Sequence, residues 1–263
     1  MKAIIPAAGH GTRFLPVTKV VPKEMLPIGS KPALELIVDE AKSAGADEIV
    51  LIISHGKELI REYFRDDPAI RFVYQEEQKG LGHAVLMAAD TVESDDRVLI
   101  LLGDCLVAGC NAAKAMAEVS AANGGASVIG LERVPQEKIS RYGIVKPQGR
   151  TRFGASDVVK IEDLVEKPSP EEAPSDLAIA GRYLLDAKIF DYLRTQAPGK
   201  GGEIQLTDAI RRMVADAPQP STLNPQLSTH NSRLLGYVYS GKRQDIGNPK
   251  GYFEALKAMG ANA

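Results

Sequence analysis

Apolar runs alternate with segments of helical spacing through the first 130 residues of the chain. The short apolar runs predict strands at residues 2–6, 49–53, 71–74, 97–102 and 126–130. Helical periodicity predicts helices at residues 33–44, 58–64, 84–89 and 111–122. Strands that alternate with helices are typical of βαβ units, so we expect an α/β fold with a mixed, mainly parallel sheet.

The pattern changes after about residue 140, where predicted strands follow one another with few helices between them. These strands are expected at residues 142–146, 158–166 and 177–183. Two helices, a strand and a last helix then follow at residues 187–194, 204–214, 234–239 and 250–259. Strands without intervening helices pair most simply as neighbours in opposite directions, so this half of the fold is expected to contain an antiparallel portion.

One segment lacks the pattern of a packed element. Residues 218–224 (PQPSTLN) and 225–231 (PQLSTHN) form a direct repeat with five of seven positions identical. Its polar and proline-rich composition cannot bury enough apolar surface to offset the entropy of ordering the chain. We therefore predict a single domain over residues 1–263 with a mobile, solvent-exposed insertion at residues 218–231; a docking peptide is the alternative.

Composition narrows the class of protein. The chain has 32 Lys and Arg residues against 34 Asp and Glu, a formal net charge of −2, which argues against a nucleic-acid coat protein. No apolar run reaches the roughly 18 residues of a membrane helix, and the amino terminus is a poor signal peptide. Two cysteines are too few for a disulfide framework. We expect a cytoplasmic protein that acts on small molecules, without a nucleic-acid or membrane partner.

The strongest local signal is the glycine-rich stretch at residues 7–31, directly after the first predicted strand. Such a loop lets backbone N–H groups approach a phosphate. The dinucleotide fingerprint fails because Phe14 stands where its third glycine belongs, and the P-loop pattern fails because no G-K-[ST] follows. The stretch carries a local charge of +3 from Arg13, Lys19, Lys23, Lys31 and Glu24. A phosphate site is indicated, and a turn with solvated lysines is the alternative.

Asp104 follows the buried run at residues 97–102, at the carboxyl edge of a parallel strand where α/β proteins place ligand sites. A carboxylate there can hold Mg²⁺ together with phosphate oxygens and water. Asp245, within the sequence RQDIG, is the second candidate ligand. A helix cap or turn residue is the alternative for Asp104. The histidines form no Ser/His/Asp or Cys/His arrangement by their spacing.

Several collinear motifs together resemble the sugar-1-phosphate nucleotidyltransferases, and the variant KEMLPI resembles their uridylyl branch. The motifs are GHGTRFLPVTKVVPKEMLPIGSKP from residue 9, Gln75 with GLGHAV at 80–85, YGIV at 142–145, VEKP at 165–168, GRY at 181–183 and GEIQLTDAI at 202–210. The resemblance implies a Rossmann-like three-layer fold with an antiparallel sugar-binding portion. It also implies transfer of a uridylyl group from UTP to glucose-1-phosphate, with Mg²⁺ as cofactor, in a homodimer or homotetramer.

The resemblance also implies a role for each matching residue. Arg13 and Lys23 would meet the triphosphate, Lys167 the sugar phosphate, and Asp104 with Asp245 the metal. Nucleotide binding would fall to Ala8, Gly9, Gly11, Thr12, Gln75 and Gly80, and sugar binding to Gly143, Glu166, Lys167 and Gly181. Many relatives carry a second acid beside the aspartate where this chain has Cys105, and a thiol is not a Mg²⁺ ligand.

Three other functions remain as alternatives. A thymidylyl- or other nucleotidyltransferase would share the scaffold and differ in the residues around Gln75 that contact the nucleobase. The amide of Gln75 could pair with the hydrogen-bonding edge of uracil. A non-catalytic sugar-nucleotide sensor would be favoured by the Asp104–Cys105 departure. A nicotinamide dehydrogenase is disfavoured by the missing third glycine. Glu166 and Lys167 could also be a plain surface ion pair.

Overall fold

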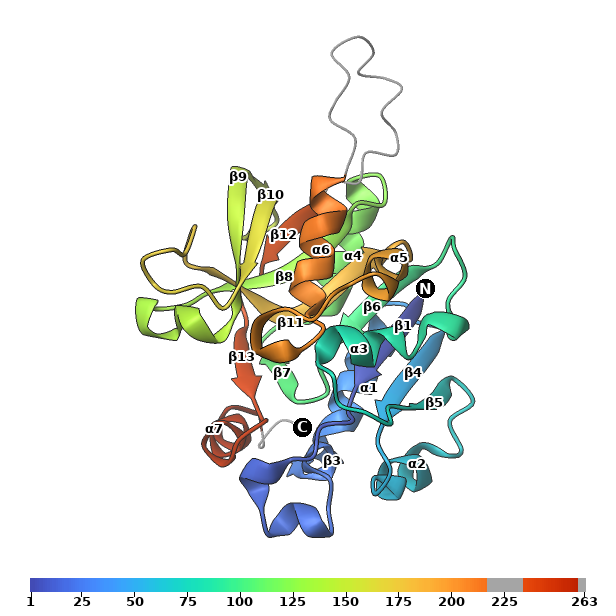
Figure 1. Ribbon diagram of the computed structural model, residues 1–263. Coiled ribbons are helices and arrows are strands. Elements are labelled where there is room, and N and C mark those ends of the chain that lie inside the picture. The colour runs from blue at the N-terminus through green and yellow to red at the C-terminus, as the bar shows by residue number, and fades with distance from the viewer. Residues whose placement is uncertain (217–233, 260–263) are drawn as a thin grey trace.

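The computed structural model describes residues 1–216 and 234–259, so the predicted insertion at residues 218–231 lies outside the described residues. Within them, a nine-stranded sheet runs through the molecule in the order β5-β4-β1-β6-β11-β8-β12-β10-β9 (Figure 1). Its strands are β1 (Lys2–Pro6), β4 (Glu48–Ile53), β5 (Ile70–Tyr74), β6 (Arg97–Leu101), β8 (Ser127–Arg133), β9 (Gly143–Phe153), β10 (Ser156–Glu166), β11 (Leu177–Asp186) and β12 (Leu234–Val238). The predicted α/β class with a mixed sheet is confirmed.

The direction of the strands divides the sheet into two parts. β5, β4, β1 and β6 are parallel neighbours, as the alternation of strands and helices predicts. β11 pairs antiparallel with both β6 and β8, and β10 pairs antiparallel with β12 and β9, while β12 and β8 are parallel. The predicted antiparallel portion is therefore present, and it joins the parallel part where β11 meets β6.

Helices cover both faces of this sheet, as the ribbon in Figure 1 shows. One face packs against α1 (Ala33–Ser43), α2 (Glu58–Phe64) and α4 (Ala112–Ala122), and the other against α3 (Leu81–Leu86), α5 (Ile189–Arg194) and α6 (Leu206–Ala215). α7 (Pro249–Met259) packs instead against short strands outside the nine-stranded sheet. Successive residues of β1 enter different cores, Ile4 one and Ile5 the other, which explains why the run is apolar throughout. No helix in the described ranges is long and apolar enough to cross a bilayer.

Some element boundaries differ from the predictions. The helix predicted at residues 84–89 is α3, which begins at Leu81, and the strand predicted at 142–146 extends to Phe153 in β9. Two small sheets were not predicted: β2 (Pro27–Ile28) with β3 (Lys31–Pro32), and β7 (Cys105–Ala108) with β13 (Lys242–Asp245). These strands have two or four residues, too few for an alternating pattern to be recognised.

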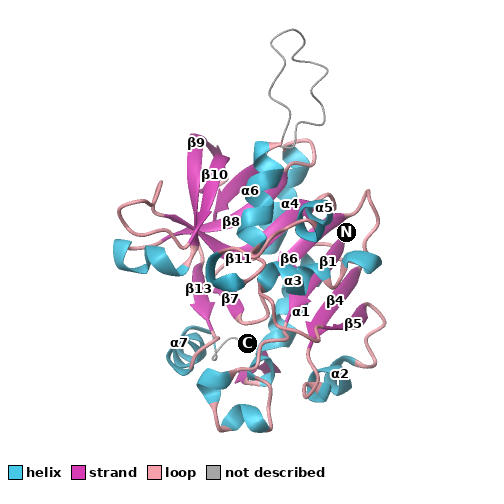
Figure 2. Ribbon diagram, viewed as in Figure 1, coloured by secondary structure: helices cyan, strands magenta, loops and turns pink. Residues whose placement is uncertain are grey.

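Three chain segments meet at the carboxyl ends of the neighbouring strands β1 and β6. β1 pairs with β4 on one side and β6 on the other, so chain connections leave in opposite directions at this point. Gly103 N–H donates to the carbonyl of Pro6 at 3.1 Å, which joins the loops after the two strands. The β7–β13 ribbon extends from these strand ends toward α7 (Figure 2). A place where neighbouring strands send their connections in opposite directions is called a topological switch point, and ligands of open α/β sheets bind there.

Candidate active site

The loop after β1 leaves backbone N–H groups unpaired. The N–H of Ala7 donates to the carbonyl of Ile52 on β4 at 2.7 Å, but those of residues 8–11 donate no hydrogen bond within the described part of the chain. Gly11 has a φ of 64°, which favours glycine, and Thr18 Oγ1 donates to its carbonyl at 2.9 Å. Consecutive free N–H groups in a turn form an anion-binding concavity. We call residues 7–11 the phosphate loop.

Two carboxylates converge beside this loop, as expected from the sequence. Asp104 follows β6, and Asp245 ends β13, where it lies opposite Cys105 in the β7–β13 ribbon. A methyl group added to Gly247 would lie 2.9 Å from Asp104 Oδ2 and 3.0 Å from Asp245 Oδ1. The two carboxylate oxygens therefore border one small space, although the two residues are more than half the chain length apart in sequence.

Lys23 provides the cation nearest to these carboxylates. Its Nζ lies 2.5 Å from Asp104 Oδ2, and its side chain is buried. Burial lowers the pKa of Lys23, but the carboxylates of Asp104 and Glu24 outweigh that effect and raise the pKa above its ordinary value. Lys23 therefore remains an ammonium group at neutral pH, beside Asp104 and beneath Gly9, whose added Cβ would lie 3.9 Å from Nζ.

The donor set suits a hard cation shared with a ligand. Asp104 and Asp245 offer carboxylate oxygens, which Mg²⁺ prefers, and residues 1–216 and 234–259 contain no group of three His, Cys, Asp or Glu side chains that could hold a metal ion by itself. Mg²⁺ commonly takes one or two protein carboxylates and fills its other positions with phosphate oxygens and water. Cys105 does not join them: its Sγ faces the carbonyl of Ala180 at 3.6 Å, and burial raises the pKa of the thiol to about 11.

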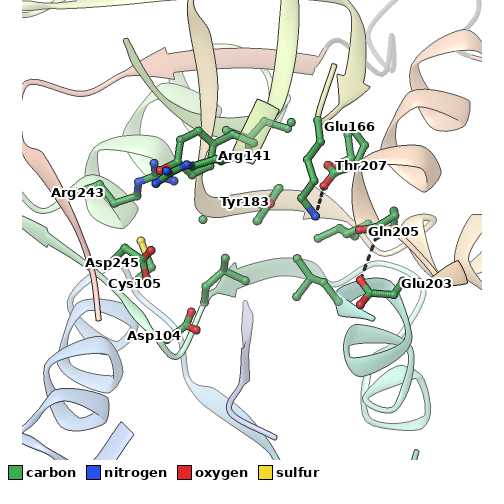
Figure 3. Close-up of a pocket in the computed structure, with 18 of the residues that line it drawn as sticks. Asp104, Cys105, Arg141, Glu166, Tyr183, Glu203, Gln205, Thr207, Arg243 and Asp245 are labelled. Carbon is green, nitrogen blue, oxygen red and sulfur yellow. Dashed lines mark hydrogen bonds and ion pairs between the residues drawn. The ribbon is translucent and has the colours of Figure 1, made fainter. Parts of the chain in front are cut away.

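A pocket of about 320 Å³ opens beside the carboxylates, over β11 and the ends of β9 and β10 (Figure 3). Figure 3 shows Asp104, Cys105 and Asp245 at one side of this pocket and Glu166, Thr207, Gln205 and Glu203 at the other, with Tyr183 between them. Charged side chains such as Arg141 and Glu203 line the pocket together with apolar ones such as Leu102, a combination that suits a phosphorylated, hydroxyl-rich ligand.

Glu166 and Lys167 form a close pair in this pocket, with Nζ 3.1 Å from Oε1. Their strand is fixed opposite Gly143, where an added Cβ would lie 3.2 Å from Glu166 Oε2 and 2.9 Å from Ile179. Lys167 has a φ of 47°, uncommon outside glycine, and its backbone is held by N–H donation to the carbonyl of Tyr142 at 3.0 Å. Because its backbone is held in this conformation, the side chain of Lys167 lines the pocket.

The structure brings part of the predicted set into the pocket and leaves part outside it. Arg13, Asp104, Gly143, Glu166, Lys167, Gly181 and Asp245 line it, and Lys23 contacts Asp104 from beside it. The predicted nucleotide-binding residues Ala8, Gly9, Gly11, Thr12, Gln75 and Gly80 do not line this pocket. Gln75 is buried, and its Nε2 donates to His83 Nδ1 at 2.9 Å. Gly80 has a φ of 99° and packs against residues 203–204.

Several pocket residues were missed as site candidates although most lie within quoted motifs: Arg141, Tyr142, Tyr183, Glu203, Gln205, Thr207 and Arg243. Arg243 pairs with Glu132 at 2.5 Å and stacks over the Tyr142 ring at 3.9 Å. Arg243 projects from the same face of β13 as Asp245 two residues later, but the four polar residues of β13 carry no strand pattern, so no signal in the sequence pointed to Arg243.

A loop with free N–H groups, a convergent carboxylate pair and a polar pocket at the switch point of a covered α/β sheet are typical of enzymes that handle phosphorylated nucleotides. The family model of the nucleotidyl transferases matches residues 2–262. The chain belongs to the nucleotidyl transferase family.

Individual relatives agree with this assignment. The chain is 38% identical to a UTP–glucose-1-phosphate uridylyltransferase of Bacillus subtilis (strain 168), over 98% of this chain and 89% of the relative. A crystal structure of UDP-glucose pyrophosphorylase complexed with UDP-glucose superposes with a TM-score of 0.83 at 34% identity, covering 98% of this chain and 97% of the other. The UTP-bound enzyme of that type from Acinetobacter baumannii has a TM-score of 0.79 at 31% identity, covering 99% and 95%.

Proposed function

We propose that this chain transfers the uridylyl group of UTP to glucose-1-phosphate and forms UDP-glucose and pyrophosphate. The observation that carries the proposal is the placement of Asp104 and Asp245 between the phosphate loop and the pocket with Glu166 and Lys167. This arrangement offers one place for a triphosphate and another for a sugar phosphate, with the carboxylates between them. The Bacillus subtilis relative is named for these two substrates.

The chemistry requires alignment and charge neutralisation more than proton transfer. A phosphate oxygen of glucose-1-phosphate attacks the α-phosphorus of UTP in line, and pyrophosphate leaves. The attacking phosphate is already ionised at neutral pH, so no general base is needed. We assign Arg13 and Lys23 to the triphosphate and the leaving pyrophosphate, and Lys167 to the phosphate of the sugar. Fixed cations of this kind act where charge accumulates in the transition state.

Asp104 and Asp245 are the residues that would hold a divalent cation, and we propose Mg²⁺. When bound, the ion would neutralise charge on the α-phosphate and the attacking group. The side chains themselves supply two hard oxygen donors, and the ammonium group of Lys23 lies 2.5 Å from Asp104 Oδ2. The thiol of Cys105, protonated at neutral pH, contributes no donor.

We assign the sugar hydroxyls to Glu166, which can accept hydrogen bonds, and close approach of the ring to Gly143 and Gly181, which present no side chain. For the base we keep Gln75 as the candidate. Burial lowers the pKa of His83, so its ring is neutral and can hold the Gln75 amide group at Nδ1. The carbonyl oxygen of Gln75 is then held in a fixed orientation, in which it can accept a hydrogen bond from the uracil ring of UTP.

The proposal includes a cytoplasmic location, where both substrates are found, and a homodimer or homotetramer by resemblance to the family. The mass of the protein in solution, measured by light scattering, tests the second point. A mass of one chain, 28.2 kDa, at micromolar concentration would refute it.

The decisive experiment is pyrophosphate release from the purified protein with UTP, dTTP, CTP or ATP against glucose-1-phosphate and galactose-1-phosphate, with Mg²⁺ or with EDTA. We expect the highest kcat/KM for UTP with glucose-1-phosphate, and no turnover in EDTA. Asp104→Asn is expected to lose turnover while it still binds UTP. Faster release with dTTP would instead identify a thymidylyltransferase, and no release with any pair would refute an enzymatic function.

A further inference from the structure

Lys57 is a buried lysine that touches the phosphate loop from behind. It precedes α2, and only 6% of it is exposed. Its Nζ donates to the carbonyl of Ala7, in the phosphate loop, and to Glu24 Oε2 at 2.8 Å. An ammonium group is rarely buried unless it is paired and hydrogen-bonded, so both partners are needed to hold it there.

The contact with Ala7 orients the loop. In a trans peptide the carbonyl and the following N–H point in opposite directions. Lys57 holds the Ala7 carbonyl, so the N–H of Ala8 points away from Lys57. Gln78 Nε2 donates to the carbonyl of Ala8 at 2.7 Å and fixes the next peptide in the same way, with the N–H of Gly9 directed away from Gln78. Two side chains therefore determine the direction of the first two free N–H donors of the loop.

The contact with Glu24 affects Lys23. Glu24 is 1% exposed and lies between the two lysines, 2.8 Å from Lys57 and 4.0 Å from Lys23. With Lys57 in place, the charge of Glu24 is already neutralised, and Lys23 makes its short contact with Asp104 instead. Without Lys57, Lys23 would be left beside the buried carboxylate of Glu24 and would be drawn toward it.

We propose that Lys57 is a positioning residue for the nucleoside triphosphate. It aims the loop N–H groups through Ala7 and, by neutralising Glu24, leaves Lys23 free to serve the phosphates and Asp104. This inference rests on the proposed function for the identity of the ligand, UTP. Lys57 itself touches no substrate, because its ammonium is enclosed between the loop and Glu24.

The test compares Lys57→Met with Lys2→Met. Lys2 lies at the opposite end of β1, also donates to a backbone carbonyl, that of Thr91, and lies 3.5 Å from both Glu48 and Asp96. UTP binding with Mg²⁺ is measured by calorimetry, and KM and kcat by pyrophosphate release. Lys57→Met is expected to weaken UTP binding about 10- to 100-fold, the range typical of losing a residue that orients a ligand-binding group, with KM for glucose-1-phosphate unchanged. Lys2→Met is expected to bind UTP as the wild type does.

A second pair of variants separates orientation from stability. Lys57→Met/Glu24→Gln removes the unpaired buried charge and should regain thermal stability relative to Lys57→Met, while UTP binding should recover only in part, because Lys23 is no longer drawn to residue 24 but Ala7 is still unheld. Lys57→Arg, which keeps the charge, should restore part of the binding. Full recovery of UTP binding in the double variant, in parallel with stability, would overturn the inference, as would normal UTP binding by Lys57→Met.

The two proposals fail differently. Calorimetry measures binding without turnover, so a wild-type protein that binds UTP but forms no UDP-glucose contradicts the proposed function alone. A wild-type protein that forms UDP-glucose, together with a Lys57→Met variant whose UTP affinity is unchanged, contradicts the inference alone.

Discussion

Gly247 lies where a single methyl group would separate the two carboxylates. In Gly247→Ala the new Cβ would stand 2.9 Å from Asp104 Oδ2 and 3.0 Å from Asp245 Oδ1. Each oxygen would have to retreat by about half an ångström to reach the ordinary contact distance of 3.4 Å. The φ of Gly247 lies outside the left-handed region, so alanine adds no backbone strain.

The expected cost to the fold is small. The atoms that must move are the ends of two side chains, of which Asp104 is 38% exposed and Asp245 is exposed. Replacing glycine with alanine also restricts the unfolded chain, a gain of about 0.4–1 kcal/mol that offsets the displacement. We expect the melting temperature to change by less than about 4 °C, since 1 kcal/mol corresponds to roughly 2–4 °C at this size.

The expected cost to the site is large. Mg²⁺ requires near-ideal geometry at about 2.0–2.1 Å from its oxygens, so displacement by half an ångström removes a usable ligand position. In UDP-glucose formation titrated with Mg²⁺, the concentration for half-maximal activity should rise at least about 10-fold. Unchanged Mg²⁺ dependence in a folded Gly247→Ala protein would refute the idea that Asp104 and Asp245 share one cation.

Asn248→Ala provides the matched control in the same turn. Asn248 Oδ1 accepts from the N–H of Gly251 at 3.0 Å, which caps α7, and its Nδ2 donates to Asp245 Oδ2 at 3.2 Å. Its loss should lower stability by about 1 kcal/mol, the usual value of a helix cap, without placing bulk between the carboxylates. A change in Mg²⁺ dependence as large as that of Gly247→Ala would show that turn stability, not carboxylate spacing, controls the metal.

Three further predictions concern other parts of the molecule. Lys167→Met should raise KM for glucose-1-phosphate about 10- to 100-fold, the value of a charged hydrogen bond, and leave KM for UTP unchanged. Lys146→Met, on the exposed face of β9, should change neither KM in the same assay. An equal rise of both KM values in Lys167→Met would contradict the assignment of Lys167 to the sugar phosphate. Burial raises the pKa of Cys105 from an ordinary value of about 9 to about 11, so the stability that this thiol contributes is complete below pH 9 and is lost as pH rises toward 11. Urea unfolding of the wild type should therefore show a loss of about 2 kcal/mol between pH 9 and pH 11 that is absent in Cys105→Ala. An equal dependence of unfolding free energy on pH in the two proteins would contradict this prediction. Arg182→Met should cost about 3–5 kcal/mol in denaturant unfolding, because Glu40 loses the buried guanidinium at 2.7 Å, and Arg182→Met/Glu40→Gln should regain part of it; a double variant no more stable than the single one would refute the pairing.

The strands of the parallel half could be predicted because their physical cause is local. β1, β4 and β6 are buried on both faces, so their residues are apolar without alternation, and the run itself identifies the strand. β7 and β13 could not be found in this way. β13 reads KRQD, four polar residues, and is extended only because it pairs with β7 across the chain.

The site divides along the same line. Asp104 was predictable from its place after a buried run, and Glu166 with Lys167 from a motif. Buried charges such as Lys57 and Arg182 were not, because a lysine before a helix or an arginine within a strand is usually solvated. Arg182 is fully buried and makes a bidentate contact with Glu40, a residue at a sequence distance that no local pattern spans.

The β7–β13 ribbon affects the order in which the site can form while the chain is synthesised on the ribosome. The phosphate loop and Asp104 belong to the first half of the chain and can be ordered early, but Asp245 is made more than half the chain length later. The carboxylate pair is complete only after β13 has been synthesised and has added to β7. A nascent chain without β13 thus carries Asp104 but not the second carboxylate, so under the proposed mechanism catalytic competence is among the last properties that it acquires.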